Sequence, residues 1–320
     1  MSRKNIKQQE KRKSKQKLKS IILMAIILLS ITLLVYSTGK FTDLKNITVN
    51  SLSQENSEID KLKNIRSKNA ILVDNKSSEI IAEKNGNTRC YPASLTKIMT
   101  TIVAIDELND LDVKIPIRSG MFESLRKSGA SMTGFLPDEK VKAKDALYGI
   151  MLPSGAESSI AIAEYISGSE DNFVKLMNEK AKELGMKNTH FTNVTGLHNN
   201  NHYTTVFDLS LLLDYALEDE IFRTIFTTEK YSTSPTNLNS AGITFSSSTF
   251  EKMDAENFVR GKIIGGKTGY TEEAGNCLAS LLENNGNEYI LITTGAKKTD
   301  KEPSSNIVDA FNIYNTYFTN

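Results

Sequence analysis

Residues 262–294 read KIIGGKTGYTEEAGNCLASLLENNGNEYILITT. Two apolar runs, 277–282 and 289–294, lie on either side of Asn285-Gly286. An Asn-Gly pair between apolar segments favours a β-hairpin with a two-residue turn. The segment before this hairpin has the length of a further strand, which a glycine pair interrupts near its start. The stretch therefore predicts three strands near the C-terminus, the last two of them joined as a hairpin.

A second hairpin is predicted where the polar N-terminal part of the chain ends. Residues 70–73 and 79–84 flank a turn at 74–77, whose sequence Asp-Asn-Lys-Ser is typical of a chain reversal. Because strands are predicted near both ends with helices between them, we expect the strands to meet in one sheet. The sequence therefore predicts an α+β fold: an antiparallel sheet built from both ends of the domain, flanked by helices, with a helical insert.

The segments between the two hairpins have the periodicity of helices. Residues 94–108 are apolar nearly all round and too long for a strand, so they are expected to form a buried helix. Ser169 and Thr205 stand at expected helix N-caps, and Asp208 is assigned to the second cap rather than to catalysis. Further helices are predicted at 146–152, 160–166 and 209–217, and a closing amphipathic helix contains Ile307, Phe311, Tyr314 and Phe318.

Positive charge is concentrated at the N-terminus of the chain. Residues 1–19 carry nine Lys and Arg and one acid, Glu10, so this segment has a net charge of +8. The whole chain has a formal net charge of +1, which leaves −7 for the remaining residues. A mildly acidic body offers no footprint for nucleic acid, so no nucleic-acid partner is expected.

An uncharged, apolar run at 20–38 follows the basic segment. Its length is near the lower limit of roughly 17–25 residues for a membrane-spanning helix, and a basic flank before it favours a cytoplasmic N-terminus. We therefore expect a single-pass transmembrane signal-anchor at 20–38, a polar linker at 39–68 and a catalytic domain at 69–320 on the outer side of the membrane. A cleaved signal peptide is the alternative.

Cys90 and Cys277 both fall in the part of the chain that is expected to be exported. An oxidising compartment permits a disulfide between them, but their spacing does not show that they meet, and two small buried residues are the simpler interpretation. The histidines, His190, His198 and His202, are expected to be structural. Together these Cys and His residues show no spacing typical of a metal site, so neither a metal nor a cofactor is expected.

Ser94-Leu95-Thr96-Lys97 opens the predicted buried helix. Positions i and i+3 share one face of a helix, so the hydroxyl of Ser94 and the amine of Lys97 are expected within hydrogen-bonding reach. A serine hydroxyl alone is a weak nucleophile, and a lysine with a lowered pKa can remove its proton. The structural alternative is a helix-capping serine beside a solvated lysine, because Ser-x-x-Lys is common by chance.

Two further triplets complete a set. Residues 267–269 (Lys-Thr-Gly) lie on a predicted strand, where the lysine and threonine can bind a carboxylate and the glycine leaves room for a substrate backbone. Residues 154–156 (Ser-Gly-Ala) lie in a turn between two predicted helices. Ser-x-x-Lys, Ser-x-Asn and Lys-Thr-Gly occur in this order in penicillin-binding proteins and class A β-lactamases.

The chain resembles the low-molecular-mass, penicillin-binding D-alanyl-D-alanine carboxypeptidases. The resemblance rests on residues 92–100 (PASLTKIMT), 147–155 (LYGIMLPSG), 181–197 (AKELGMKNTHFTNVTGL) and 266–275 (GKTGYTEEAG), and it extends from about residue 70 to about residue 318. It implies a bacterial enzyme that removes the terminal D-alanine from peptidoglycan stem peptides. It also implies that β-lactams act as covalent inhibitors.

The resemblance implies a role for each motif in the reaction. Ser94 would attack the carbonyl carbon of the D-Ala-D-Ala bond and form an acyl-enzyme, with Lys97 as general base. Ser154, assisted by Lys267, would relay the proton to the leaving amine. Water would then release the shortened peptide.

The same resemblance implies how the substrate is bound. Thr268 would help to bind the terminal carboxylate, and Gly269 would let the substrate lie along the strand. The backbone N–H groups of Ser94 and Tyr270 would form an oxyanion hole, in which each donor is typically worth about 2.7–4 kcal/mol.

One residue departs from the family pattern. The second motif usually ends in an asparagine that binds the substrate backbone, whereas this chain has Ala156, and Glu157 or a backbone group could replace the missing amide. A degenerate sensor that binds β-lactams or stem peptides is therefore an alternative, as is a D,D-endopeptidase that cuts crosslinks. A class A β-lactamase is disfavoured, because residues 155–266 contain no Glu-x-x-Leu-Asn segment.

Overall fold

The computed structural model describes residues 61–253, 259–298 and 304–318. These belong to the second of the two units into which the chain divides, which starts at Ile59. The predicted basic segment at 1–19 and the predicted membrane span at 20–38 lie outside the described residues. Within the described part, no helix combines the length and the apolar character that crossing a membrane requires.

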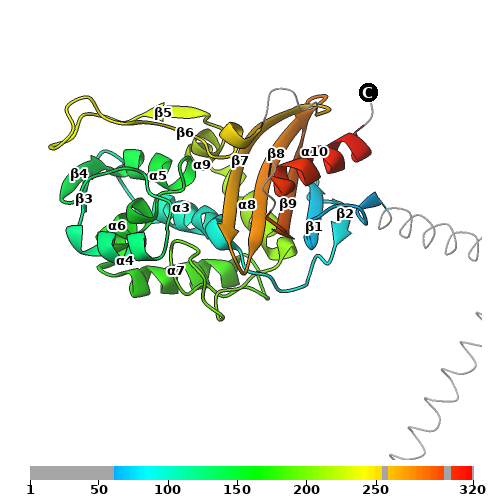
Figure 1. The fold of residues 1–320 in the computed structure, drawn as a ribbon, viewed down its shortest axis with the longest axis horizontal. Helices are drawn as coiled ribbons and strands as arrows, with labels where there is room; N and C mark the ends of the chain where they lie inside the picture. Colours follow the sequence, from blue (N-terminus) through cyan, green and yellow to red (C-terminus); the bar gives the residue numbers. More distant parts are fainter. Residues whose placement is uncertain (1–60, 254–258, 299–303, 319–320) are drawn as a thin grey trace, which may run out of the picture. The chain divides into compact units, whose positions relative to one another are not determined.

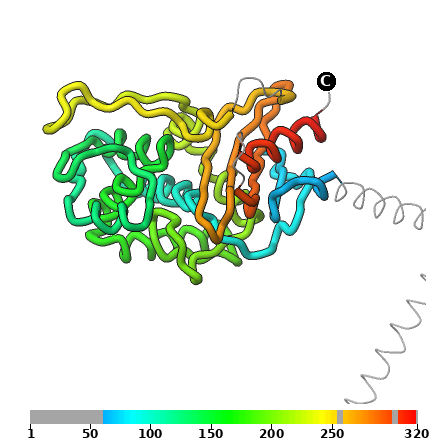
Figure 2. Tube along the Cα trace, viewed as in Figure 1, coloured from blue at the N-terminus to red at the C-terminus, as the bar shows by residue number. Residues whose placement is uncertain are grey.

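A five-stranded sheet with the order β2-β1-β9-β8-β7 forms one side of the unit (Figure 1). Its strands are β1 (Asn69–Asp74), β2 (Ile80–Lys84), β7 (Lys262–Thr271), β8 (Gly275–Asn284) and β9 (Asn287–Ala296). All neighbours are antiparallel, and β1 pairs with β9 from Asn69↔Thr294 to Asp74↔Tyr289. The N-terminal strands thus lie beside the C-terminal ones, as Figure 2 shows, which confirms the predicted sheet built from both ends of the domain.

Both predicted hairpins are present. Asn285 and Gly286 join β8 to β9 with φ values of 52° and 77°, the left-handed pair that a type I′ turn requires. In the first hairpin, the Asp74 carboxylate accepts the backbone N–H groups of Lys76 and Ser77, both at 2.9 Å. Local turn chemistry therefore fixes both reversals.

Helix α10 (Ser305–Tyr317) covers one face of the sheet, and its side chains pack with apolar residues of the strands. Leu62 and Ile65 belong to the same cluster and are buried. Asp309 accepts hydrogen bonds from the backbone N–H groups of Arg66 and Ser67. The residues from 61 to 68, assigned to the linker from their polarity, are therefore part of the folded unit.

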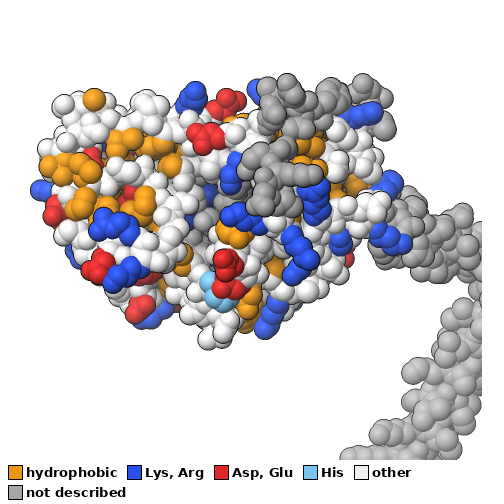
Figure 3. Space-filling view, in the orientation of Figure 1, with side chains coloured by type: hydrophobic (Ala, Val, Ile, Leu, Met, Phe, Trp, Pro, Cys, Tyr) orange, Lys and Arg blue, Asp and Glu red, His pale blue; other side chains and the backbone are white. Residues whose placement is uncertain are grey.

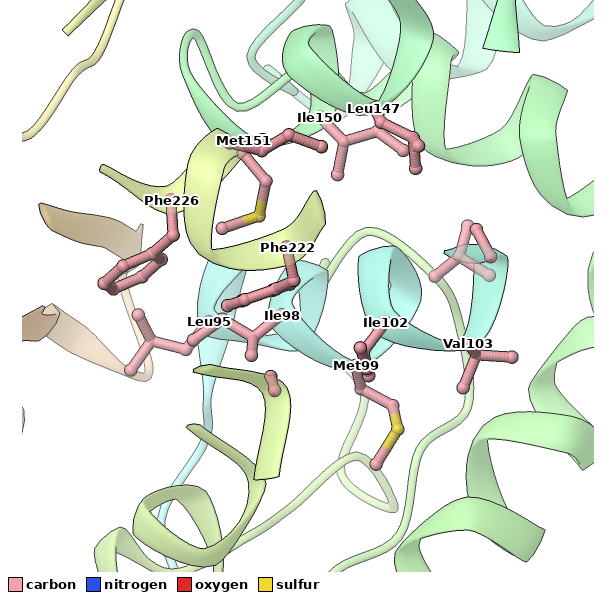
Figure 4. Packing of buried hydrophobic residues seen from close by; sticks show 14 of the residues in the cluster. Leu95, Ile98, Met99, Ile102, Val103, Leu147, Ile150, Met151, Phe222 and Phe226 are labelled. Atoms are coloured by element: carbon pink, nitrogen blue, oxygen red, sulfur yellow. The ribbon is translucent and has the colours of Figure 1, made fainter. Parts of the chain in front are cut away.

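The opposite side of the sheet carries the helical insert, in which α3 (Thr96–Glu107) is central. Ten of its twelve residues are buried, and Figure 4 shows Ile98 beside Phe222 of a neighbouring helix. The other helices are η1 (Ala93–Leu95), η2 (Ser119–Met121), α4 (Phe122–Lys127), α5 (Ala143–Met151), α6 (Ala156–Ser167), α7 (Glu170–Glu183), α8 (Val206–Glu218), α9 (Glu220–Phe226) and η3 (Phe250–Lys252).

The two predicted helix caps are present. The Ser169 hydroxyl accepts the N–H of Asn172 at 3.2 Å, and the Thr205 hydroxyl accepts the N–H of Asp208 at 3.0 Å. The Asp208 carboxylate does not complete a reciprocal capping box. It instead accepts hydrogen bonds from the backbone N–H of Asn188 and the hydroxyl of Thr189, and so ties the preceding loop to α8.

Two small ribbons were not predicted from the sequence. They pair β3 (Lys114–Ile117) with β4 (Glu139–Lys142) and β5 (Lys230–Ser232) with β6 (Thr244–Ser246). Each strand has three or four residues, too few to show a clear alternation of apolar and polar side chains. A two-stranded ribbon is marginally stable by itself, so packing on the insert decides whether it forms.

Candidate active site

A cavity of about 440 Å³ lies where the helical insert meets the C-terminal end of β7. Its walls come from η1 and α3, from the segment after α4, from the start of α6, from the loop after α7 and from the end of β7. The lining residues are Ser94, Lys97, Ser128, Gly129, Ala130, Ser131, Ala156, Thr195, Gly196, Leu197, His198, Tyr270, Thr271, Glu272 and Glu273. The first predicted motif thus contributes Ser94 and Lys97, and the second contributes Ala156. Residues 267–269 of the third motif do not line the cavity, but Tyr270 and Thr271, which follow them on β7, do.

Ser94 lies in the 3₁₀ turn η1, immediately before α3, and is half-buried. The strand and the adjoining loop approach its backbone closely. A Cβ added at Gly269 would lie 2.9 Å from the Ser94 nitrogen, and one added at Gly196 would lie 1.8 Å from the Ala93 oxygen. Ala93 itself has φ of 47°, a left-handed conformation that costs energy for a residue with a side chain. Both glycines are therefore needed to place β7 and the loop against the turn that carries Ser94.

Lys97 lies one turn along from Ser94, with its Nζ 3.3 Å from the Ser94 Oγ. The same Nζ donates a hydrogen bond to the Thr195 carbonyl at 2.7 Å, and the side chain is 2% exposed. Burial lowers the pKa of Lys97 to about 7, against an opposing effect of the Glu157 charge. A large share of Lys97 is therefore neutral near pH 7, and its lone pair can accept the proton of Ser94 while an N–H still bonds Thr195.

Lys267 is fully buried, and its Nζ donates to the Thr268 carbonyl at 2.9 Å. Burial lowers the pKa of Lys267 far below its ordinary value, and the nearby charges of Lys97 and Lys252 lower it further. The hydroxyls of Thr268 and Ser248 are 3.0 Å apart. The strand thus places a second amine near Lys97. Because like charges repel, protonation of one lysine disfavours protonation of the other.

Ser154 lies in the turn between α5 and α6, with φ of 68°. Its Oγ is buried and has no hydrogen-bond partner among the described residues. Ser154 does not line the cavity, although Ala156, two residues on, does. A buried hydroxyl without a hydrogen-bond partner lowers the stability of the fold by about 1–3 kcal/mol, so Ser154 is an unfavourable residue for the fold alone.

Ala156 begins α6, and its N–H donates to the Ser131 carbonyl at 2.9 Å. The next residue, Glu157, is fully buried, and its Oε1 accepts the backbone N–H of Gly134 at 2.9 Å. Its other oxygen has no partner among the described residues, and burial raises the pKa of the carboxyl. Glu157 does not line the cavity, and its Oε1 is engaged by the loop at Gly134.

The three histidines occupy different environments. The His202 Nε2 lies 2.8 Å from the Thr96 hydroxyl, and burial lowers the pKa of His202 to about 4, so the ring is neutral and structural. His190 contacts a backbone carbonyl of its own loop. His198 lines the cavity, and its Nδ1 lies 3.8 Å from the Glu273 carboxylate. Of the three histidines, His198 is the one on the cavity wall, and the expectation that all three are structural stays a prediction.

Cys90 and Cys277 are both free thiols in this structure. Cys277 is fully buried opposite Gly269 on the neighbouring strand, and Cys90 is half-buried. Burial raises the pKa of Cys90 to about 11 and that of Cys277 to about 12, so both stay protonated near neutral pH. Of the two possibilities left open by the sequence, the structure contains the pair of reduced thiols.

Three residues beside the predicted motifs were missed. The Thr195 carbonyl fixes the amine of Lys97, Ser248 contacts the hydroxyl of Thr268, and Ser131 holds the start of α6. Two of these contacts use backbone carbonyls, whose direction no residue type reveals. Thr195 falls within the stretch 181–197 on which the family resemblance rests, and this was the one signal that pointed to it.

Comparisons with known proteins agree on one family. The D-alanyl-D-alanine carboxypeptidase family profile matches residues 50–298. The chain is 32% identical over 302 residues to the D-alanyl-D-alanine carboxypeptidase DacF of Bacillus subtilis, covering 92% of this chain and 72% of DacF. It is 31% identical to DacA of Escherichia coli, covering 67% of this chain and 52% of DacA. The crystal structure of the Streptomyces K15 DD-transpeptidase superposes with a TM-score of 0.69 at 27% identity, covering 78% of this chain and 96% of that one.

Proposed function

The chain belongs to the D-alanyl-D-alanine carboxypeptidase family, and we propose that it removes the terminal D-alanine from peptidoglycan stem peptides through an acyl-serine intermediate. The observation that carries this proposal is the contact between Ser94 and a buried, low-pKa Lys97 in a cavity bounded by the Lys-Thr-Gly strand. A hydroxyl nucleophile beside a desolvated amine is a recognised arrangement for acyl transfer.

In the acylation step, neutral Lys97 accepts the proton of the Ser94 hydroxyl as its Oγ bonds to the carbonyl carbon of the penultimate D-alanine. The backbone N–H groups of Ser94 and Tyr270 stabilise the oxyanion. The C–N bond to the terminal D-alanine then breaks, and the leaving nitrogen takes up the proton. Water next attacks the ester, gives one proton back to Ser94 through Lys97 and releases the shortened peptide.

Ser154 is proposed to pass the proton from Lys97 towards the leaving nitrogen, assisted by Lys267. Its buried hydroxyl supports this role, because it has no hydrogen-bond partner among the described residues and lies only two residues before Ala156 of the cavity wall. Lys97 lies close enough to the buried Lys267 for the charge of Lys97 to lower the pKa of Lys267. The two amines can therefore differ in protonation during the transfer.

Substrate is proposed to lie along β7 as an added strand. Gly269 supports this geometry, since any side chain there would collide with the backbone of Ser94. Thr268 is proposed to bind the terminal carboxylate, and Tyr270, which is 40% exposed, to border the stem peptide. An antiparallel substrate would then place its carboxylate near Thr268 and its N-terminal residues beyond Tyr270.

The finer aspects of location and role are also proposals. The +8 flank and the uncharged run at 20–38 support a single-pass anchor that holds the catalytic unit outside a bacterial membrane. A degenerate sensor would not need a nucleophile with a tuned base. Crosslink cleavage would use the same residues and differs only in the leaving group.

The test combines fluorescent-penicillin labelling with mass spectrometry of a digested stem pentapeptide. We expect one covalent label per chain and the loss of one D-alanine. Ser94→Ala should abolish both and leave the melting temperature unchanged. Labelling without peptide hydrolysis would support the sensor, and cleavage of crosslinked dimers only would support the endopeptidase. Undiminished labelling of the Ser94→Ala protein would refute the assignment of the nucleophile.

A further inference from the structure

A second cavity, of about 850 Å³, is larger than the one that contains Ser94. Four cations line it, Arg66, Lys68, Lys84 and Arg89, against one carboxylate, Glu273. The chain after residue 19 has a net charge of −7, so this concentration of positive charge runs against the average of that part of the chain. Figure 3 shows Lys and Arg side chains gathered on the side where β1 and β2 lie. We call this cavity the cationic cleft.

Three of the four cations are available to a ligand. Arg66, Lys68 and Arg89 are exposed, and none of the ion pairs between described residues includes them. Arg89 is held over the Tyr203 ring, 4.2 Å from its centroid. Lys84 differs, because its Nζ donates to the carbonyls of Ile65 and Ser67 at 3.3 and 3.0 Å. Lys84 thus braces the segment that carries Arg66 and Lys68.

The cationic cleft is continuous with the cavity at Ser94. A third cavity of about 400 Å³, lined also by Lys297 and Lys298, lies between them. It shares Tyr270, Glu272 and Glu273 with the cavity at Ser94, and Lys68, Glu273, Ala274 and Gly295 with the cationic cleft. The three cavities therefore form one groove.

The sheet gives the length of this groove. Tyr270 of β7 pairs with Asn276 of β8, which pairs with Ala296 of β9, and the Lys68 N–H bonds the Thr294 carbonyl at 2.9 Å. From β7 to β1 there are three strand spacings of about 4.8 Å, or about 14 Å. An extended peptide of five residues spans about 17 Å. These 14 Å run across the strands, so a stem peptide that lies along β7 must turn beyond Tyr270, and the group attached to its N-terminus is then the part that faces the cationic cleft.

We propose that the cationic cleft is an anion-binding extension of the substrate groove, which takes a phosphate group attached beyond the N-terminal end of the stem peptide. Arginine forks match phosphate oxygens with paired hydrogen bonds, and Asn85, Asn200 and Asn201 add amide groups to the lining. The inference rests on the proposed function, since it takes the substrate to run from Thr268 past Tyr270. It makes a phosphorylated stem-peptide conjugate a better substrate than the free peptide.

The test compares two substrates on the full chain. One is a nucleoside-diphosphate-linked muramyl pentapeptide, and the other is an N-acetylated tripeptide that ends in D-Ala-D-Ala and has no phosphate. The combined variant Arg66→Gln, Lys68→Gln, Arg89→Gln should raise KM for the phosphorylated substrate about tenfold, with kcat unchanged. KM for the tripeptide should not change. The matched control is Lys175→Gln, Lys182→Gln, Lys187→Gln, which removes the same charge from exposed positions on and after α7 and should change neither KM.

Several outcomes would overturn the proposal: equal KM values for wild type and variant on the phosphorylated substrate, an equal rise on both substrates, or an equal rise in the control. Weaker binding of the variant to phosphatidylglycerol vesicles, with both KM values unchanged, would assign the cleft to a membrane surface instead. The same comparison can be made without turnover. Calorimetry gives the Kd of the phosphorylated conjugate for the Ser94→Ala protein and for a Ser94→Ala protein that also lacks the three cations, and the Kd should be higher for the second. Failure of the tripeptide to react at all would reject the proposed function separately.

Discussion

The Nζ of Lys97 lies 3.3 Å from the Ser94 Oγ and is held there by a hydrogen bond of 2.7 Å to the Thr195 carbonyl. The two residues belong to different elements, since Ser94 is in η1 and Lys97 in the first turn of α3. Burial of α3 both fixes their separation and lowers the pKa of the amine to about 7. The position of the motif in the core therefore gives Lys97 the low pKa that its proposed role as base requires, because the same lysine on a solvated helix would stay charged.

Acylation should depend on pH through Lys97. The base works in its neutral form, so the rate of labelling by fluorescent penicillin should rise as pH increases through about 7 and level off near pH 8. The measurement is the second-order acylation rate between pH 5.5 and 8.5. Lys97→Arg, which stays protonated, should lose roughly 10²–10⁴-fold at every pH. An acylation rate of the wild-type protein that does not change with pH would show that Lys97 is not the base.

The sequence predicted the parts of the fold that depend on local chemistry. Asn285-Gly286 defines a turn by itself, and Ser94 and Lys97 share a face on any helix. The ribbons did not follow from the sequence, because strands of three or four residues depend on what they pack against. The contact of Lys97 with the Thr195 carbonyl could not be predicted either, since every residue type has a backbone carbonyl. The burial of Leu62 and Ile65 was not predicted, because most residues around them in the sequence are polar.

Glu157→Gln should shift the pH profile of acylation. The Glu157 carboxylate raises the pKa of Lys97 against the larger effect of burial, so a neutral amide should move the profile to lower pH. Glutamine can still accept the N–H of Gly134, which keeps the loop in place. The readout is the midpoint of the acylation profile, compared with that of wild type. A midpoint that moves to higher pH would contradict this electrostatic account.

The same substitution should change stability in a pH-dependent way. Burial raises the pKa of Glu157 in the folded protein, so its contribution is fully present below the unfolded pKa of 4.5 and is lost as pH rises through the folded value. Glu157→Gln should therefore raise the melting temperature more at pH 8 than at pH 4.5. A larger gain at pH 4.5 would mean that the carboxylate is stabilised by partners rather than penalised by burial.

Gly269→Ala should disable the site while the sheet survives. The new methyl group would lie 2.9 Å from the Ser94 nitrogen and 3.2 Å from the Ala93 Cβ, so η1 must move away from β7. A displacement of about 1 Å at a reacting group can cost roughly 100-fold in rate. We expect such a loss in acylation rate with a modest fall in melting temperature. Gly120→Ala is the matched control, because nothing lies within 4 Å of its added Cβ, and it should leave acylation unchanged.

Ala156→Asn tests the one motif position that departs from the family. Ala156 lines the cavity and is anchored by its N–H to Ser131, while Glu157 points away, so an added amide would enter the cavity beside Ser94. One recovered hydrogen bond to the substrate should raise kcat/KM on a D-Ala-D-Ala peptide by roughly three- to tenfold.

Ser131 also lines this wall, and its hydroxyl could already occupy the place of the amide. In that case Ala156→Asn would lower kcat/KM, and Ser131→Ala alone would lower it as well. Steady-state kinetics of both single variants and the double variant, with melting temperatures as controls for folding, separate these cases. A fall in kcat/KM for Ala156→Asn at unchanged melting temperature would mean that the cavity is arranged around alanine, and the account based on a missing hydrogen bond would be abandoned.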